Sequence, residues 1–195
     1  VRVIARVQDD SGTGLKASVR YRHDGQVSFK SAPMTLASNG DWVGTLPASN
    51  NLTVVQFFVR FEDGEGAVRQ YPQLAQTQTL QSRLPLRPST GSADRQAVCL
   101  YQVDDTFDIK AARTPGAKPV YRLIAPREEM EMIRDLVNMS GRGNAYNNHM
   151  HATFISVDGR NTQLRYQVSA RIRGHGSRSN FPPGLRVSFP SDAPW

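Results

Sequence analysis

The strongest constraint on the fold is a series of short segments in which apolar and polar residues alternate between turn-forming residues. Beyond the alternation of residues 1–7, the segments are Ala17–Arg22, Val27–Lys30, Met34–Leu36, Trp42–Leu46, Val54–Glu62 and Ala67–Tyr71. Turn signals such as Asp24-Gly25 and Asn39-Gly40 separate them. Many short strands at close spacing are typical of an antiparallel sandwich. We therefore predict a β-sandwich for residues 1–72, with Trp42, Phe57, Val59 and Phe61 in its core.

This first part resembles the immunoglobulin-like and fibronectin-like modules of bacterial surface proteins, which are usually spacers or binding platforms. It contains no recognisable constellation of catalytic residues. Four acidic residues, Asp9, Asp10, Asp63 and Glu65, are candidate calcium ligands if they gather at one end of the sandwich. A role in forming turns is the more common explanation for such residues.

The next two parts differ in composition. Residues 73–96 are rich in Gln, Thr, Ser and Pro and lack periodicity, which predicts a linker. Residues 97–195 then predict an α+β domain with one clear helix over Arg127–Val137. Pro126 suits the first helical turn, and the expected buried face consists of Met130, Ile133 and Val137.

Composition narrows the function only a little. The net charge of +7 comes almost wholly from arginine, which allows a nucleotide, a nucleic acid or an acidic polymer as partner and selects none of them. No apolar run reaches membrane-spanning length, and no signal peptide is present. The single cysteine, Cys99, lies in a strand-like run and is expected to be buried.

Two alternating runs near the C-terminus flank a glycine-rich loop. Along 166–173, Tyr166, Val168, Ala170 and Ile172 point one way, so Gln167, Ser169, Arg171 and Arg173 point the other. If this run pairs with Leu185–Phe189 as a hairpin, Arg186 joins Arg171 and Arg173 on one basic face. The backbone amides and hydroxyls of the loop are donors suited to an anion. The alternative is a basic, solvated hairpin whose glycines only permit positive φ.

Histidines and serines near this hairpin do not predict further chemistry. His149 and His151 are spaced to share a strand face, but no third ligand supports a zinc site, so no metal site is predicted. A triad of Ser177, His175 and Asp158 lacks the spacing of a nucleophile elbow, and we predict no catalytic residue in the chain.

Residues 97–195 resemble the N-terminal portion of the spore coat protein H (CotH) family of atypical kinases. The resemblance is carried by Val103-Asp-Asp105, Pro119–Ile124 followed by the helix, Ala152–Gly159, and Val168–Arg178 leading to Pro182–Phe189. A β-sandwich in front of such a domain is a familiar arrangement in exported bacterial members.

The resemblance implies a kinase-like fold that binds ATP with magnesium and phosphorylates Ser or Thr of a partner protein. The positions that match the family's flap near the nucleotide are Arg171, Arg173, Gly174, Gly176, Ser177 and Arg178. Arg186 lies on the returning strand, where most members carry a lysine, and His175-Gly176 replaces the usual Asn-Ser-like pair. The resemblance therefore leaves open whether the parent protein is active.

In this family the acidic residues that hold magnesium lie beyond the matched segment. We therefore expect the chain to be an inactive fragment of an exported, extracytoplasmic or cell-surface bacterial protein. The alternative is a surface or adhesion scaffold that binds an acidic polymer or a partner protein without catalysis. Nucleic acid is a weaker option, because no aromatic residues are interleaved with the arginines.

Overall fold

The chain forms two compact units, both built mainly of β-strands, which confirms the predicted β-rich class. The computed structural model describes residues 1–7, 14–73, 97–138, 150–173 and 184–190. The first unit comprises Val1–Leu74 and Ala97–Asp105, and the described part of the second begins at Thr106. No helix among the described residues is long and apolar enough to cross a membrane.

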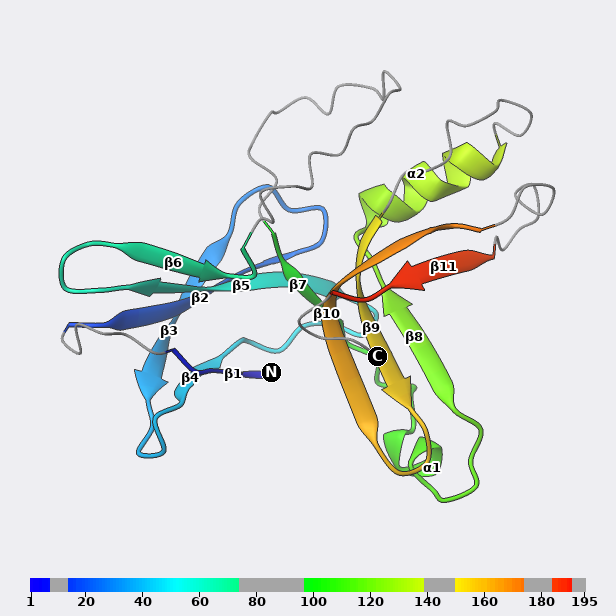
Figure 1. The fold of residues 1–195 in the computed structure, drawn as a ribbon, viewed down its shortest axis with the longest axis horizontal. Coiled ribbons are helices and arrows are strands. Elements are labelled where there is room, and N and C mark those ends of the chain that lie inside the picture. Colours follow the sequence, from blue (N-terminus) through cyan, green and yellow to red (C-terminus); the bar gives the residue numbers. More distant parts are fainter. Residues whose placement is uncertain (8–13, 74–96, 139–149, 174–183, 191–195) are drawn as a thin grey trace. The chain divides into compact units, whose positions relative to one another are not determined.

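The described part of the first unit consists of seven antiparallel strands (Figure 1). They are β1 (Arg2–Ala5), β2 (Lys16–His23), β3 (Lys30–Leu36), β4 (Trp42–Thr45), β5 (Val54–Glu62), β6 (Val68–Tyr71) and β7 (Cys99–Gln102). Their order is β1-β4-β3-β2-β5-β6, and β7 also pairs with β5. Both β6 and β7 pair with β5, because they use different parts of it. β7 pairs with Val54–Phe57 and β6 pairs with Val59–Glu62.

Strand β3 belongs to both halves of this sheet, so the strands form a single curled path. The first half of β3 pairs with β2, and its second half, Met34–Leu36, pairs with β4. The curl brings β4 over β2: a Cβ added to Gly44 would lie 3.0 Å from Cγ2 of Val19. The ring centroids of Trp42 and Phe61 are 6.3 Å apart.

The predicted core of this unit is largely confirmed. Phe57, Val59 and Phe61 alternate along β5 and are buried on its inner face, whereas Trp42 is only partly buried. Alternation along this strand thus located one buried face of β5, and Phe58 on its opposite face is buried as well, at 6% exposure.

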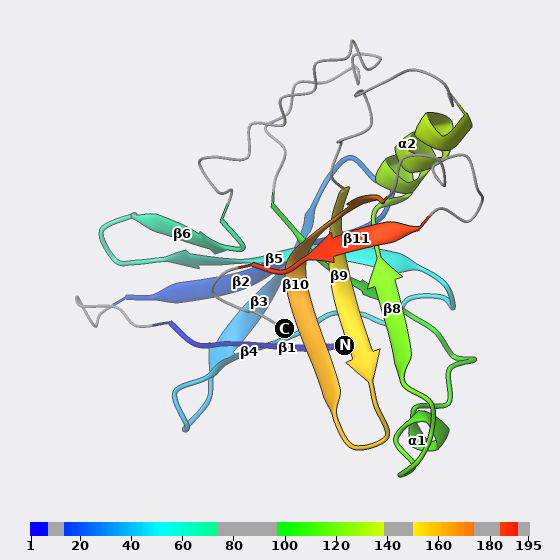
Figure 2. The same cartoon turned by 45° about the vertical axis from the view of Figure 1, so that its right-hand side comes forward.

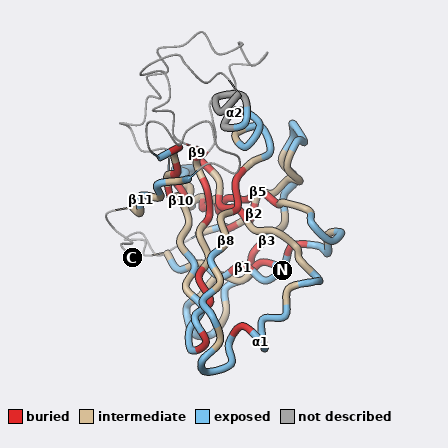
Figure 3. The backbone as a smooth tube through the Cα atoms, turned by 90° about the vertical axis from the view of Figure 1, so that its right-hand side faces the viewer, coloured by how far each residue is buried: buried red, intermediate tan, exposed pale blue. Residues whose placement is uncertain are grey.

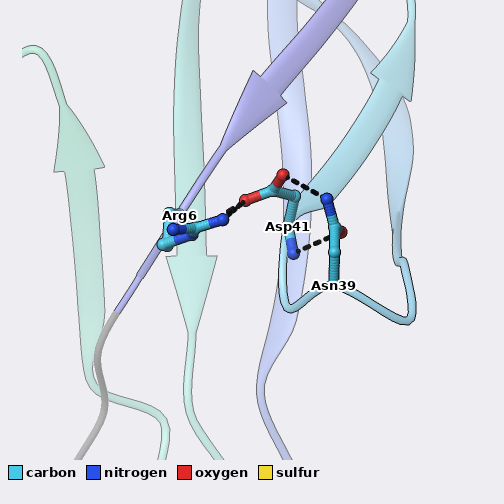
Figure 4. Close-up of polar contacts among 3 residues, drawn as sticks. All are labelled: Arg6, Asn39 and Asp41. Carbon is cyan, nitrogen blue, oxygen red and sulfur yellow. Dashed lines mark hydrogen bonds and ion pairs between the residues drawn. The ribbon is translucent and has the colours of Figure 1, made fainter.

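Polar side chains fix the turn between β3 and β4 (Figure 4). Nε of Arg6 donates to Oδ1 of Asp41 at 2.8 Å, and Nδ2 of Asn39 donates to Oδ2 of the same carboxylate at 2.7 Å. The backbone N–H of Asp41 in turn donates to Oδ1 of Asn39 at 3.1 Å. The carboxylate therefore ties the turn to the residue that follows β1.

The acidic residues considered as calcium ligands divide into two groups. Oδ1 of Asp63 accepts the backbone N–H groups of Glu65 and Ala67, at 3.0 and 2.8 Å, which is a turn-forming role. Asp9 and Asp10 lie outside the described residues. The interpretation of Asp63 as a turn residue is therefore supported by its contacts.

The boundary between the units differs from the one we predicted. We placed residues 97–105 with the second domain, but β7 pairs with β5 of the first unit, Cys99 lying opposite Phe57. The backbone N–H of Asp105 also donates to Oδ1 of Asn51 at 2.9 Å. The first unit therefore extends to Asp105, while residues 74–96 of the predicted linker lie outside the described residues.

The second unit contains a four-stranded antiparallel sheet of order β11-β10-β9-β8 (Figure 2). Its elements are α1 (Ile109–Ala112), β8 (Val120–Ile124), α2 (Arg127–Asn138), β9 (Met150–Val157), β10 (Thr162–Ile172) and β11 (Leu185–Ser188). The helix predicted over Arg127–Val137 is confirmed as α2. The expected burial of Met130 is wrong, since this side chain is 45% exposed. The side chains of Ile133 and Val137 lie outside the described part.

Buried residues follow β9 and β10 (Figure 3), and an apolar core lies on one face of this sheet. Its buried members are Ala125, Met150, Ala152, Val168, Ala170 and Ile172. Partly buried apolar residues pack around them, and the rings of Phe154 and Phe189 meet edge to face with centroids 5.2 Å apart. From Val168 onward, the polar residues of β10 alternate with these apolar residues, so they lie on the opposite face together with the polar residues of β11.

Candidate anion-binding site

The hairpin of β10 and β11 gathers arginines on one face. Arg171 lies directly opposite Arg186, and Ile172 directly opposite Leu185. Ala170 and Ile172 are buried on the apolar face, so Arg171 and Arg186 project from the other. The predicted pairing of the two runs is confirmed, and it places the two arginines directly opposite each other.

Arg173 extends this basic face. Its backbone N–H donates to the carbonyl oxygen of Gly184 at 2.7 Å, so the pairing continues to this residue and places Arg173 diagonal to Arg186. Arg173, Leu185 and Arg186 line an open depression of about 320 Å³. Among the described residues, no carboxylate forms an ion pair with Arg173 or Arg186.

Arg171 and Arg186 place two positively charged side chains directly opposite each other on neighbouring strands. Like charges directly opposite on neighbouring strands are destabilising. An anion placed between them reverses the sign of this interaction, and guanidinium groups bind phosphate and carboxylate through paired hydrogen bonds. The pair Arg171–Arg186 therefore has the composition and the position of an anion-binding site.

A row of polar side chains runs beside the arginines on the same face. Ser169 of β10 lies opposite His151 of β9 on one side and opposite Ser188 of β11 on the other. The row is two residues along β10 from Arg171, roughly 7 Å away at the usual strand rise. We had not connected His151 or Ser188 with the arginines, although the alternation Arg186-Val187-Ser188 already places Ser188 on their face.

Helix α2 contributes an acidic group at the border of this row. Oε2 of Glu129 accepts the backbone N–H of His151 at 2.5 Å, and Oε1 lies 3.8 Å from Nδ1 of the same residue. The side chain of Glu129 is 19% exposed, and that of His151 is 34% exposed. Glu129 thus positions the start of β9 and places a negative charge beside the imidazole.

A β-bulge limits the site in the other direction. The pairing of β9 and β10 shifts by one residue between Arg165 and Val168, and Gln167 adopts a φ of 55°. Arg165 lies opposite Phe154, which packs against the apolar core. The strict alternation that we predicted from Tyr166 therefore holds only from Val168 onward.

Other predicted site residues are not part of the described structure. Gly174, Gly176, Ser177 and Arg178, together with His175, lie outside the described residues. Within the described ranges, no group of three or more His, Cys, Asp or Glu residues is arranged to hold a metal ion. Asp158, considered as a triad member, has a structural role: its Oδ1 accepts the N–H groups of Arg160 and Asn161, at 3.1 and 2.7 Å.

Comparison with known proteins does not identify a family. No protein-family model matches the sequence, and no curated protein is significantly similar to it. The resemblance to CotH kinases therefore stays a hypothesis. The chemistry of the β10–β11 face remains the main basis for a functional proposal.

Proposed function

We propose that the second unit binds the phosphate groups of a nucleotide on the face that carries Arg171, Arg173 and Arg186. The observation that carries the proposal is the direct pairing of Arg171 with Arg186. A phosphate group between them accepts hydrogen bonds from two planar guanidinium groups and offsets both charges. Arg173 supplies a third positive charge from the diagonal position, beside the open depression.

The resemblance to CotH kinases supplies the biochemical setting for this proposal. In that setting the nucleotide is ATP with magnesium, and the full-length parent is an exported bacterial protein that phosphorylates Ser or Thr of a partner. The matched residues contribute positive charge at the phosphates, which a phosphoryl-transfer site needs. Carboxylates that hold magnesium are not among the matched residues, so we expect the chain alone to bind without catalysis.

The test is calorimetric titration of the chain with ATP and with tripolyphosphate at low salt. We expect Arg171→Ala and Arg186→Ala each to weaken binding by about 10- to 100-fold, because a hydrogen bond to a charged group contributes about 1.5–3 kcal/mol. Arg160→Ala is the matched control, since it removes the same charge roughly 30 Å along the hairpin. Undiminished affinity in both site variants contradicts the proposal.

A second candidate is a scaffold that binds an acidic polymer or an acidic partner protein. It is favoured by the exposure of Arg173 and Arg186, which lie beside an open depression and not a closed cavity. The two functions differ in their response to salt. Polymer binding that weakens steeply between low and physiological salt, with no measurable binding of ATP, supports the scaffold.

A further inference from the structure

We infer that His151 belongs to the same anion-binding site and takes up a proton when a polyphosphate binds. This inference rests on the proposed phosphate binding and adds a residue and a regulation to it. Its basis is the register of the sheet: His151, Ser169 and Ser188 form one row across three strands, and Arg171 and Arg186 form the adjacent row. Directly opposed residues have Cβ atoms about 5 Å apart, so the imidazole and the hydroxyl groups face one continuous surface.

Charged side chains of both signs lie near His151. The carboxylate of Glu129 approaches from α2, with Oε1 at 3.8 Å from Nδ1. Arg171 from β10 and Arg186 from β11 lie in the next row of the sheet. Histidine is the side chain that ordinarily changes charge between pH 5 and 8. An anion bound on the arginine row adds negative charge beside the ring and therefore favours the imidazolium form.

The spacing of the two rows defines the class of ligand. They are separated by roughly 7 Å along the strands, so a ligand with several phosphate groups spans both rows more readily than a single phosphate does. A ligand with several phosphate groups reaches both rows and meets two arginines, two serine hydroxyls and the imidazolium. By linkage, a ligand that promotes protonation of His151 binds more tightly at lower pH.

The test compares the unmodified chain with His151→Gln, using tripolyphosphate as the probe at pH 5.5 and 7.5. We expect the ratio of the two affinities to be about fivefold larger for the unmodified chain, as a rise of about one pKa unit on binding gives between these two pH values. The ligand's own titration affects both proteins equally and cancels in this comparison. His23→Gln, in the first unit, is the matched control and should behave like the unmodified chain. The dependence on His151 should be smaller for inorganic phosphate than for tripolyphosphate.

The possible results distinguish a failure of this inference from a failure of the proposed function. If the unmodified chain binds tripolyphosphate at neither pH, the proposed function fails and the inference fails with it. If it binds but the pH ratio is the same in His151→Gln, only the inference is overturned. Proton NMR of the imidazole gives an answer without a variant. The titration midpoint of His151 should move to higher pH when tripolyphosphate is added, and an unchanged midpoint contradicts the inference.

Discussion

At the scale of single residues, the turn between β9 and β10 approaches another backbone segment closely at Gly159. A Cβ at this position would lie 2.9 Å from the carbonyl oxygen of Thr114, and the φ of Gly159 is +81°. Nearby, Nε and Nη2 of Arg113 both donate to Oγ1 of Thr162, at 3.0 and 2.8 Å. The turn between β9 and β10 therefore packs against the residues that follow α1, and glycine is what permits the contact.

Gly159→Ala should destabilise the second unit more than Gly116→Ala. Both residues have positive φ, but a Cβ added to Gly116, with a φ of +85°, meets nothing within 4 Å. We expect about 1–2 kcal/mol for Gly116→Ala from the backbone conformation alone. Gly159→Ala should cost at least about 1 kcal/mol more, because Thr114 must also move. Urea unfolding of both variants measures the difference, and equal losses would show that the close approach is unimportant.

At the scale of elements, the turn that joins β9 and β10 is held by a side chain. Asp158 donates its N–H to the carbonyl oxygen of Asn161 at 3.2 Å, and its Oδ1 accepts the N–H groups of Asn161 and Arg160. These hydrogen bonds, that from Asn161 first and that from Arg160 next, lower the pKa of Asp158 below its ordinary value of 3.8. The ionised carboxylate is therefore the form that stabilises the turn.

The pH dependence of this turn follows from the lowered pKa of Asp158. Because the folded-state pKa lies below the unfolded value, the contribution to stability is present above the unfolded pKa. It is lost as the pH falls through the folded pKa, below about pH 4. Asp158→Asn keeps the acceptor oxygen, so its stability should fall less steeply with acid. Carbon NMR should give a titration midpoint below 3.8 for this carboxyl group, and a midpoint above 3.8 would contradict the assignment.

At the scale of the whole molecule, the first unit is completed by a strand that follows residues 74–96. Cys99 and Leu100 of β7 are buried, at 2% and 1% exposure, and Cys99 lies opposite Phe57. Burial raises the pKa of the Cys99 thiol to about 12, so the thiolate is scarce in the folded unit. The first unit therefore includes chain from both sides of the segment predicted as a linker.

A polypeptide of residues 1–105 should be more stable than one of residues 1–96. Loss of β7 leaves one side of β5 unpaired at Val54–Phe57 and removes the buried Cys99 and Leu100, at roughly 1.5–3 kcal/mol for a side chain of leucine size. Urea unfolding compares the two, both of which contain residues 74–96. In the longer polypeptide, a thiol reagent should label Cys99 only as the unit unfolds. Equal stabilities, or rapid labelling of the folded unit, would show that β7 is not part of it.

Local patterns predicted much of this molecule because each depends on neighbours in sequence. Alternation located one of the two buried faces of β5 and the opposite faces of β10, and the helix signals after Pro126 located α2. The pairing of Arg171 with Arg186 followed from two alternating runs joined by one loop.

What the patterns missed depends on residues distant in sequence. Nothing near Cys99 indicates that its partner strand contains Phe57, and nothing near Glu129 indicates that it contacts His151. The bulge was missed for a different reason. Tyr166 and Gln167 fit an unbroken alternation, and only the pairing with β9 shows the additional residue.

That additional residue controls how far the positive electrostatic potential extends along β10. Without it, Arg165 would share the parity of Arg171, and the two charges would lie on one surface of the sheet. With it, Arg165 faces the side of Phe154, and the arginines that share a surface are confined to the end of the hairpin near β11. The bulge concentrates the charge, so an approaching anion meets one localised maximum of potential and not a long, weakly attractive stripe.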